Sequence, residues 1–262
     1  MTKILLVGCG KMGGAMLDGW LDQGVAIKDV VVVEPSGEIG RSGIVVVKDA
    51  GGIPAGFSPD IVVLAVKPQM MDGALPAYAR FSDSLFLSIA AGKTLAYFAA
   101  KLGKVAVVRA MPNTPAAVRR GMTVAVPNAK VTLDQRGKAE ALLSSVGDVA
   151  WVDNEDLMDA VTAVSGSGPA YVFLMAEVLA QAGVAAGLPG DLAARLARAT
   201  VSGAGELLNK SPESAAQLRQ NVTSPGGTTF AALQVLMAGD GMEPLLTKAV
   251  AAASQRSKEL AS

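Results

Sequence analysis

The first half of the chain alternates short apolar runs with segments whose apolar residues recur every three to four positions. The apolar runs are rich in valine, isoleucine and leucine, and they predict β-strands at residues 3–7, 30–33, 44–47, 60–66, 84–89, 104–108, 122–126 and 148–152. The periodic segments predict helices at residues 15–21, 69–80, 95–102 and 133–146. Strands that alternate with helices in this way are typical of a doubly wound α/β sheet.

Beyond Asp153 the pattern changes. From Glu155 onward the chain is rich in alanine and leucine at helical spacing, and no further strand is predicted. Glycine and proline interrupt these helices at residues 187–190, 211–212 and 224–226. We therefore expect an α/β domain at residues 1–153 and an all-helical domain at residues 154–262. Such small-residue helices form either a self-contained bundle or a face that is buried against a second copy of the chain.

Three glycines follow the first predicted strand in the spacing G-x-G-x-x-G. Gly8 permits a tight turn, Gly10 lets a pyrophosphate approach the backbone, and Gly13 allows the next helix to pack closely on the strand. The backbone at Lys11 and Met12 then faces the phosphates, because the free N–H groups of a helix N-terminus favour an anion. We expect a Rossmann-type domain that binds a dinucleotide at this loop.

The other central strands also end in small or turn residues. In an open α/β sheet the carboxyl ends of the strands form the ligand crevice, so these turns are expected to converge on the cofactor. The candidates are Ala65, Val66, Lys67, Pro68, Ala90, Ala91, Gly92, Pro112 and Asn113. Taken one at a time, each turn is equally well explained as an ordinary loop, because glycine and proline occur in loops of every fold.

Composition narrows the classes of function. Lys+Arg and Asp+Glu are equal at 23 each, so no net charge attracts nucleic acid or an acidic membrane. We expect no cleavable leader and no apolar run of membrane-spanning length, and hence a cytoplasmic protein. The single cysteine, Cys9, forms no internal disulfide and is interpreted as a small turn residue. The absence of histidine removes the commonest general acid and metal ligand, so we expect no metal.

Several longer motifs occur in a fixed order along nearly the whole chain. They are AVKP at residues 65–68, AAG at 90–92, MPNTP at 111–115, DAVTAVSGSGPAY at 159–171 and VTSPGGTT at 222–229. With these motifs the chain resembles the pyrroline-5-carboxylate reductase family, which reduces 1-pyrroline-5-carboxylate to L-proline with NADPH or NADH. The resemblance implies a Rossmann domain, a helical dimerisation domain, a homodimer and, in many members, further assembly into decamers.

The chemistry that the resemblance implies is compatible with a chain that lacks histidine. A cyclic iminium can arrive already protonated, so the site must mainly orient it toward a hydride donor. Gly226, Gly227 and Thr228 are expected to open a helix that holds the substrate carboxylate, while the Thr229 hydroxyl bonds the ring nitrogen as the catalytic group. Ser224, Glu155 and Asn221 complete the expected substrate contacts. The alternative role of Ser224 and Pro225 is simply to cap the helix.

Two rival functions remain open at this point. A related two-domain hydroxy-acid dehydrogenase would need a base, which in such enzymes is a lysine four residues after the last glycine of a helix start. After Gly168 that position is Val172, so the base is missing. The second rival is a nucleotide-sensing protein without catalytic activity, because fold does not fix function.

The choice of cofactor is the point at which the chain departs from the family. Family members mostly prefer NADPH and carry small hydroxyl or basic residues just after the second strand. Here that strand ends in Glu34, whose carboxylate would accept bonds from the ribose hydroxyls of NADH and repel a 2′-phosphate. Ser36 and Arg41 lie near enough in sequence to reach a phosphate if Glu34 turns away. We therefore expect both cofactors to be used, with NADH unusually competitive.

Overall fold

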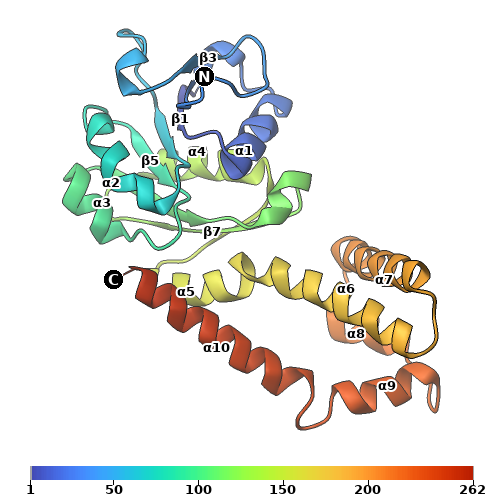
Figure 1. Ribbon diagram of the computed structural model, residues 1–262. Coiled ribbons are helices and arrows are strands. Elements are labelled where there is room, and N and C mark those ends of the chain that lie inside the picture. The colour runs from blue at the N-terminus through green and yellow to red at the C-terminus, as the bar shows by residue number, and fades with distance from the viewer. Residues whose placement is uncertain (1, 262) are drawn as a thin grey trace. The chain divides into compact units, whose positions relative to one another are not determined.

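The computed structural model describes residues 2–261, which divide into two compact units. The first comprises Met1–Gly166 together with Ser254–Ser262 and contains the sheet, and the second comprises Ser167–Ala253 and is helical (Figure 1). This division does not follow the expected boundary at residues 153 and 154, because Met158 is buried against Val124 and Val126 of the first unit. The division of roles, with dinucleotide binding in residues 1–153 and substrate binding and dimerisation in residues 154–262, stays a prediction.

The first unit is built on a sheet whose strands match the predicted apolar runs. Its strands are β1 (Ile4–Val7), β2 (Val30–Val33), β3 (Val45–Val47), β4 (Ile61–Leu64), β5 (Leu85–Ser88), β6 (Ala106–Met111), β7 (Gly121–Pro127) and β8 (Gly147–Trp151). Their order is β3-β2-β1-β4-β5-β6-β7-β8, and only β7 runs antiparallel to a neighbour, β6. The order reverses between β1 and β4, so the ligand crevice of such a fold lies outside their carboxyl ends.

Helices cover both faces of this sheet, which explains why its central strands are apolar on both sides. On one face α1 (Lys11–Asp22) and α4 (Leu133–Ser144) bury Trp20 and Leu142, and the Trp20 indole donates a hydrogen bond to the Leu142 carbonyl at 3.0 Å. On the other face α2 (Met71–Ala74) and α3 (Leu95–Leu102) bury Met71 and Phe98. The sheet therefore has two apolar layers that do not depend on another chain.

The predicted helix at residues 69–80 is wrong as a single element. The chain there forms a 3₁₀ turn at Pro68–Met70, the one-turn helix α2 and a second 3₁₀ turn at Leu75–Tyr78. Pro68 and Pro76 each lie in the first turn of a 3₁₀ piece, where a missing N–H costs little, whereas Pro76 inside a continuous helix would remove a hydrogen bond. The apolar spacing was helical, but the prolines divide it.

The second unit contains the long helices of the C-terminal half. These are α6 (Gly168–Ala185), α7 (Gly190–Lys210), α8 (Ala215–Asn221), α9 (Thr228–Leu236) and the larger part of α10 (Met242–Ala261), while α5 (Met158–Val161) precedes them in the first unit. Three of the helix breaks fall where glycine and proline predicted them, and a further break at residues 237–241, between α9 and α10, was not predicted. Between α6 and α7, Gly187 has a φ of +98° and its neighbour Leu188 donates a hydrogen bond to the Gly183 carbonyl, as in a helix C-cap that requires glycine.

Candidate functional site

A cavity of about 670 Å³ lies at the carboxyl ends of β1, β2, β3 and β4, where the strand order reverses. Its lining includes six of the predicted cofactor residues: Gly8, Gly10, Glu34, Ala65, Val66 and Lys67. The rest of the lining comes from the turn after β3 and from the short helical pieces after β4. The sequence predicted that the turns after the central strands would converge, and in this cavity the structure brings together the glycine loop, Glu34 and the turn that begins at Ala65.

The glycine loop has the geometry that its spacing predicts. Gly8 has a φ of +89°, and a methyl group there would come within 3.0 Å of the Ala65 carbonyl. A methyl group at Gly13 would collide with the Gly8 carbonyl oxygen, whereas one at Gly10 would meet no atom within 4 Å. Gly10 is also the N-cap of α1 and has no side-chain cap, so the first-turn N–H groups at Lys11 to Gly13 stay available to an anion. The residues present therefore fit a dinucleotide pyrophosphate.

Glu34 is turned toward this loop and not away from it. Its carboxylate accepts hydrogen bonds from the Cys9 backbone N–H at 2.8 Å and from the Ser36 backbone N–H at 3.4 Å. Arg41 is bound elsewhere, because its guanidinium pairs with Asp18 of α1 and donates to the Ile39 carbonyl at 2.8 Å. Ser36 and Arg41 were expected to bind a phosphate only if Glu34 turned away from the loop. This condition is not met in this structure.

Two ionisable groups near the loop remain neutral. Burial raises the pKa of the Cys9 thiol, which makes it a poor nucleophile and supports its interpretation as a turn residue. Burial also raises the pKa of Tyr78, whose ring lines the cavity, to about 12. The Tyr78 phenol is therefore uncharged at physiological pH.

The later predicted loops lie outside the lining of this cavity. Ala90 and Pro112 are buried, and Gly92, with a φ of +74°, packs against the end of α10, where a methyl group would approach the Leu260 carbonyl oxygen to 3.1 Å. The Asn113 side chain is fully used: it donates to the Ser165 carbonyl at 3.2 Å and accepts from the Met122 N–H at 2.9 Å. Asn113 thus ties its loop to the π-helical segment Thr162–Gly166, a feature that often marks functional sites.

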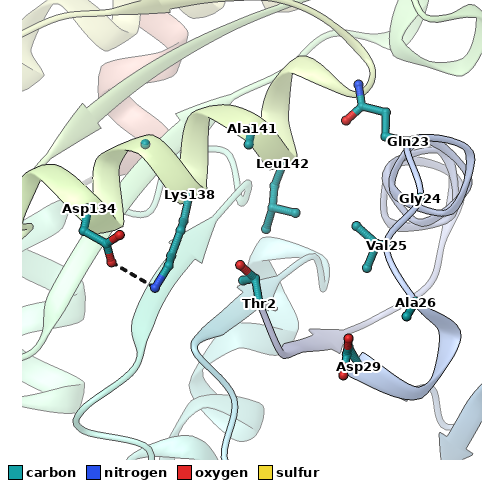
Figure 2. Close-up of a pocket in the computed structure, with 11 residues that line it drawn as sticks. Thr2, Gln23, Gly24, Val25, Ala26, Asp29, Asp134, Lys138, Ala141 and Leu142 are labelled. Atoms are coloured by element: carbon teal, nitrogen blue, oxygen red, sulfur yellow. Dashed lines mark ion pairs between the residues drawn. The ribbon is translucent and has the colours of Figure 1, made fainter.

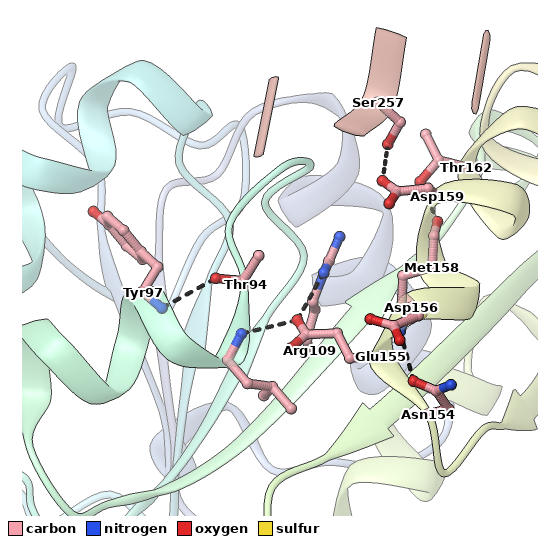
Figure 3. Close-up of polar contacts among 11 residues, drawn as sticks. Thr94, Tyr97, Arg109, Asn154, Glu155, Asp156, Met158, Asp159, Thr162 and Ser257 are labelled. Carbon is pink, nitrogen blue, oxygen red and sulfur yellow. Dashed lines mark hydrogen bonds and ion pairs between the residues drawn. The ribbon is translucent and has the colours of Figure 1, made fainter. Parts of the chain in front are cut away.

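Glu155 has a structural task in the first unit that the sequence did not reveal. One carboxylate oxygen accepts a hydrogen bond of 2.8 Å from the Leu95 N–H at the start of α3 (Figure 3). The same oxygen forms an ion pair of 2.7 Å with Arg109 of β6. Arg109 is 5% exposed, so its charge needs this partner. The expected contact of Glu155 with the substrate stays a prediction.

The remaining predicted substrate residues lie in the second unit. The segment Ser224, Gly226, Gly227, Thr228 and Thr229 leads directly into α9, whose N-cap is Gly227 without any side-chain cap. The Ser224 hydroxyl therefore does not act as the helix cap that the alternative interpretation required. Asn221 ends α8 and donates to the carboxylate of Glu213 at 3.0 Å, a residue that the sequence motifs did not single out. The uncapped N–H groups of α9 are suited to an anion.

A second cavity, of about 620 Å³, lies at the other end of the strands (Figure 2). It is bordered by Thr2 before β1, by Asp29 before β2 and by the Lys138–Asp134 ion pair of α4 at 2.9 Å. Ligands of open α/β sheets bind at the carboxyl ends of the strands, and this cavity is at their amino ends. It is not the dinucleotide site.

A mainly parallel sheet, a glycine loop at an uncapped helix N-terminus and a carboxylate after β2 together define a dinucleotide-binding protein of the Rossmann class. Comparison with known proteins is more specific. A family model described as NADP oxidoreductase, coenzyme F420-dependent, matches residues 3–92, and one described as pyrroline-5-carboxylate reductase dimerisation matches residues 155–260. The pyrroline-5-carboxylate reductase of Pseudomonas aeruginosa is 42% identical over 99% of this chain and 97% of its own length. The chain belongs to the pyrroline-5-carboxylate reductase family.

Solved structures agree with this assignment. A pyrroline-5-carboxylate reductase from Coxiella burnetii superposes with a TM-score of 0.92 at 36% identity, over 100% of this chain and 99% of its own. The Plasmodium falciparum enzyme, solved with NADP bound, superposes with a TM-score of 0.83 at 29% identity, over 100% of this chain and 98% of its own. The resemblance and the expected fold class are confirmed. The chain is an NAD(P)H-dependent oxidoreductase, and its C-terminal half is of a kind that forms homo-oligomers.

One expectation about the membrane needs correction. The helical stretch Glu155–Ala185 has 31 residues and includes an 18-residue window with a mean hydropathy of 1.3, which is long and apolar enough to cross a membrane by length and composition alone. The expectation that no apolar run reaches that length is therefore not met. This stretch lies within the region matched by the dimerisation model. A helix buried between subunits can be as long and as apolar as a membrane-spanning helix, so length and composition do not distinguish the two kinds of helix.

Proposed function

We propose that this chain reduces 1-pyrroline-5-carboxylate to L-proline with NADPH or NADH, the last step of proline biosynthesis. Family membership supports the reaction, and the observation that carries the proposal is the uncapped N-terminus of α9, which bears Thr228 and Thr229. An α/β unit with a dinucleotide cradle alone would suit many oxidoreductases. A helix N-terminus that is free to bind a carboxylate suits an amino-acid precursor.

The residues of the second unit bind and orient the imine in this proposal. The N–H groups at Gly226 and Thr228 hold the substrate carboxylate, with Ser224 beside them. The Gly227 N–H donates to the Ser224 carbonyl at 3.1 Å and fixes the turn that presents these groups. The Thr229 hydroxyl bonds the ring nitrogen and fixes which face of the C=N bond is presented. An iminium that arrives protonated needs no strong enzymic acid, so a chain without histidine can catalyse the reaction by orientation. Asn221 and Glu155 remain proposed substrate contacts.

The residues of the first unit position the cofactor, which supplies the hydride when it is bound. Gly8, Gly10 and the N–H groups from Lys11 to Gly13 hold the pyrophosphate at the start of α1. The Glu34 carboxylate accepts hydrogen bonds from the ribose hydroxyls of NADH, with Ser36 next to it. The remaining contacts follow the later strands, at Ala65 to Pro68, Ala90 to Gly92, Pro112 and Asn113. Met12 contributes through its backbone.

The proposal extends to assembly and location. We expect a homodimer as the smallest active species, with further association into a decamer, and a cytoplasmic enzyme without a membrane or nucleic-acid partner. The exposed apolar side chains of α6, among them Phe173 at 66% and Leu174 at 54% exposure, support at least the dimer.

Oxidation of NADPH and NADH, followed by absorbance with 1-pyrroline-5-carboxylate as substrate, tests the function. We expect turnover with this imine and none with 2-oxo acids, the substrates that a hydroxy-acid dehydrogenase would reduce. Turnover of the oxo acids alone would instead establish the dehydrogenase. Tight cofactor binding without turnover of either substrate class would establish a nucleotide-sensing protein and overturn the proposal.

A further inference from the structure

Lys48 lies beside Glu34 although the two residues are far apart in the sequence. β3 pairs with β2 in parallel, with Val47 opposite Val33, and the Glu34 N–H donates to the Val47 carbonyl at 2.9 Å. Lys48 is the next residue after β3, as Glu34 is the next after β2. Both side chains line the cavity at the switch point.

The Lys48 stem follows the turn that begins at Glu34. Gly37 closes this turn by donating to the Glu34 carbonyl at 2.8 Å, and it has a φ of +73°. A methyl group at Gly37 would lie 3.3 Å from Lys48 Cε, so the side chain passes directly over the turn. In a Rossmann-type fold the end of β2 is where the adenosine ribose and its 2′ substituent bind.

The two carboxylates in this part of the cavity are already engaged. Glu34 is held by the N–H groups of Cys9 and Ser36, and Asp49 accepts bonds from Gly51 and Gly52 in its own turn. Within residues 2–261, no carboxylate forms an ion pair with Lys48. The Lys48 ammonium is therefore available to an anion.

We propose that Lys48 binds the 2′-phosphate of NADPH and thereby allows the enzyme to use this cofactor despite Glu34. This inference rests on the proposed function and extends it to the choice between cofactors. A lysine is a flexible point charge that can reach a phosphate in several positions, which suits a site that must also accept a free ribose hydroxyl. Glu34 then favours NADH and Lys48 favours NADPH in the same pocket.

Binding measured without turnover tests the proposal directly. Calorimetric titration of Lys48→Met with NADP⁺ is expected to give a Kd about tenfold or more above that of the unmodified enzyme, the value of one charge-assisted hydrogen bond. The Kd for NAD⁺, which lacks the 2′-phosphate, should change by less than about twofold by the same argument. Lys28→Met is the matched control, since Lys28 is an exposed lysine that precedes β2 at the opposite edge of the sheet.

Kinetics provide the second measurement. In Lys48→Met, kcat/KM for NADPH should fall by about tenfold while that for NADH is retained, and its decline with added salt should become shallower because a screened charge pair is lost. Unchanged NADP⁺ binding and unchanged NADPH kinetics in Lys48→Met would overturn the inference. If instead the unmodified enzyme binds both cofactors but reduces no imine, the proposed function fails while the binding comparison still decides the role of Lys48.

Discussion

The two units of the chain differ most in how they bury their apolar residues. In the first unit every residue of β1, β2, β4 and β5 is buried, between helices on both faces. In the second unit Ala193 and Ala197 are the buried residues within Ser167–Ala253, although α6 is apolar over most of its surface, with Glu177 and Gln181 together on one side. A helix whose apolar surface extends that far round belongs largely in an interior. The first unit has its interior within one chain, and the second requires another copy to form one.

This difference gives similar residues different tasks. Valine and leucine in the sheet form the interior of the first unit, whereas we expect valine and leucine in α6 to contact another copy of the chain. We therefore expect the stability of the second unit, but not that of the first, to depend on protein concentration. The following substitutions distinguish the two units, beginning with the largest expected effect.

The largest effect is expected from a charge in the exposed face of α6. Leu174→Asp should convert the oligomer to monomers and abolish activity, because burying an unpaired carboxylate in an apolar interface costs several kcal/mol. Sedimentation velocity at micromolar concentration measures the change. Leu133→Asp is the matched control, because Leu133 is 88% exposed in the first turn of α4, where an acidic residue is favourable. A Leu174→Asp protein that stays oligomeric and active would show that this face is not an interface.

The next effect concerns chemistry in the second unit. Thr229→Ala should lower kcat for imine reduction by roughly tenfold to a thousandfold, the range for one hydrogen bond made to the reacting group. Titration with NADP⁺ should show unchanged affinity, because cofactor contacts belong to the first unit. Thr247→Ala removes a hydroxyl that donates to the Glu243 carbonyl inside α10, and it should leave kcat unaltered. Full turnover by Thr229→Ala would remove this residue from the mechanism.

A third substitution tests the interior of the first unit. Arg109→Met should lower the free energy of unfolding by about 3 kcal/mol, because it leaves the Glu155 carboxylate without its cation in a largely enclosed site. Urea unfolding followed by circular dichroism measures the loss. The double variant Arg109→Met with Glu155→Gln should recover most of it, since an apolar or neutral pair avoids the unpaired charge. Equal stability of Arg109→Met and the unmodified protein would contradict a structural role for the pair.

The smallest effect is a change of preference. Glu34→Ser should shift the ratio of kcat/KM toward NADPH by about tenfold, because the carboxylate that repels a 2′-phosphate is removed. The comparison requires both cofactors with both proteins. The unmodified enzyme could instead prefer NADPH by about a hundredfold, with no change on substitution. That result would show that Glu34 does not contact the ribose.

Local patterns were sufficient to predict most of the first unit. Runs such as Val30–Val33 are too apolar and too β-branched for a solvated loop, and Gly8 occurs where a positive φ is required. Each of these inferences depends on neighbours in the sequence. The helix expected at residues 69–80 is divided because Pro76 lacks the N–H group that a continuous helix would need. The prediction missed this because it used only the spacing of apolar residues.

The features that escaped prediction depend on residues distant in the sequence. Lys48 reaches the end of β2 only because β3 pairs beside it, and Glu155 meets Arg109 across 46 positions. The amide of Asn113 binds Ser165 and Met122, two contacts that no local pattern indicated, and its expected contact with the cofactor stays a prediction. No local pattern specifies which polar side chains a fold will pair, because burial and geometry decide that after the chain has folded.

The last turns of α10 affect how the protein is made. Ser257 donates a hydrogen bond of 2.6 Å to Asp159 (Figure 3). The Leu260 carbonyl lies against Gly92, so the first unit includes residues that are distant from its sheet in the sequence. A ribosome delivers the strands of the sheet before α10. The first unit therefore completes its packing at Gly92 only after α10 has been synthesised.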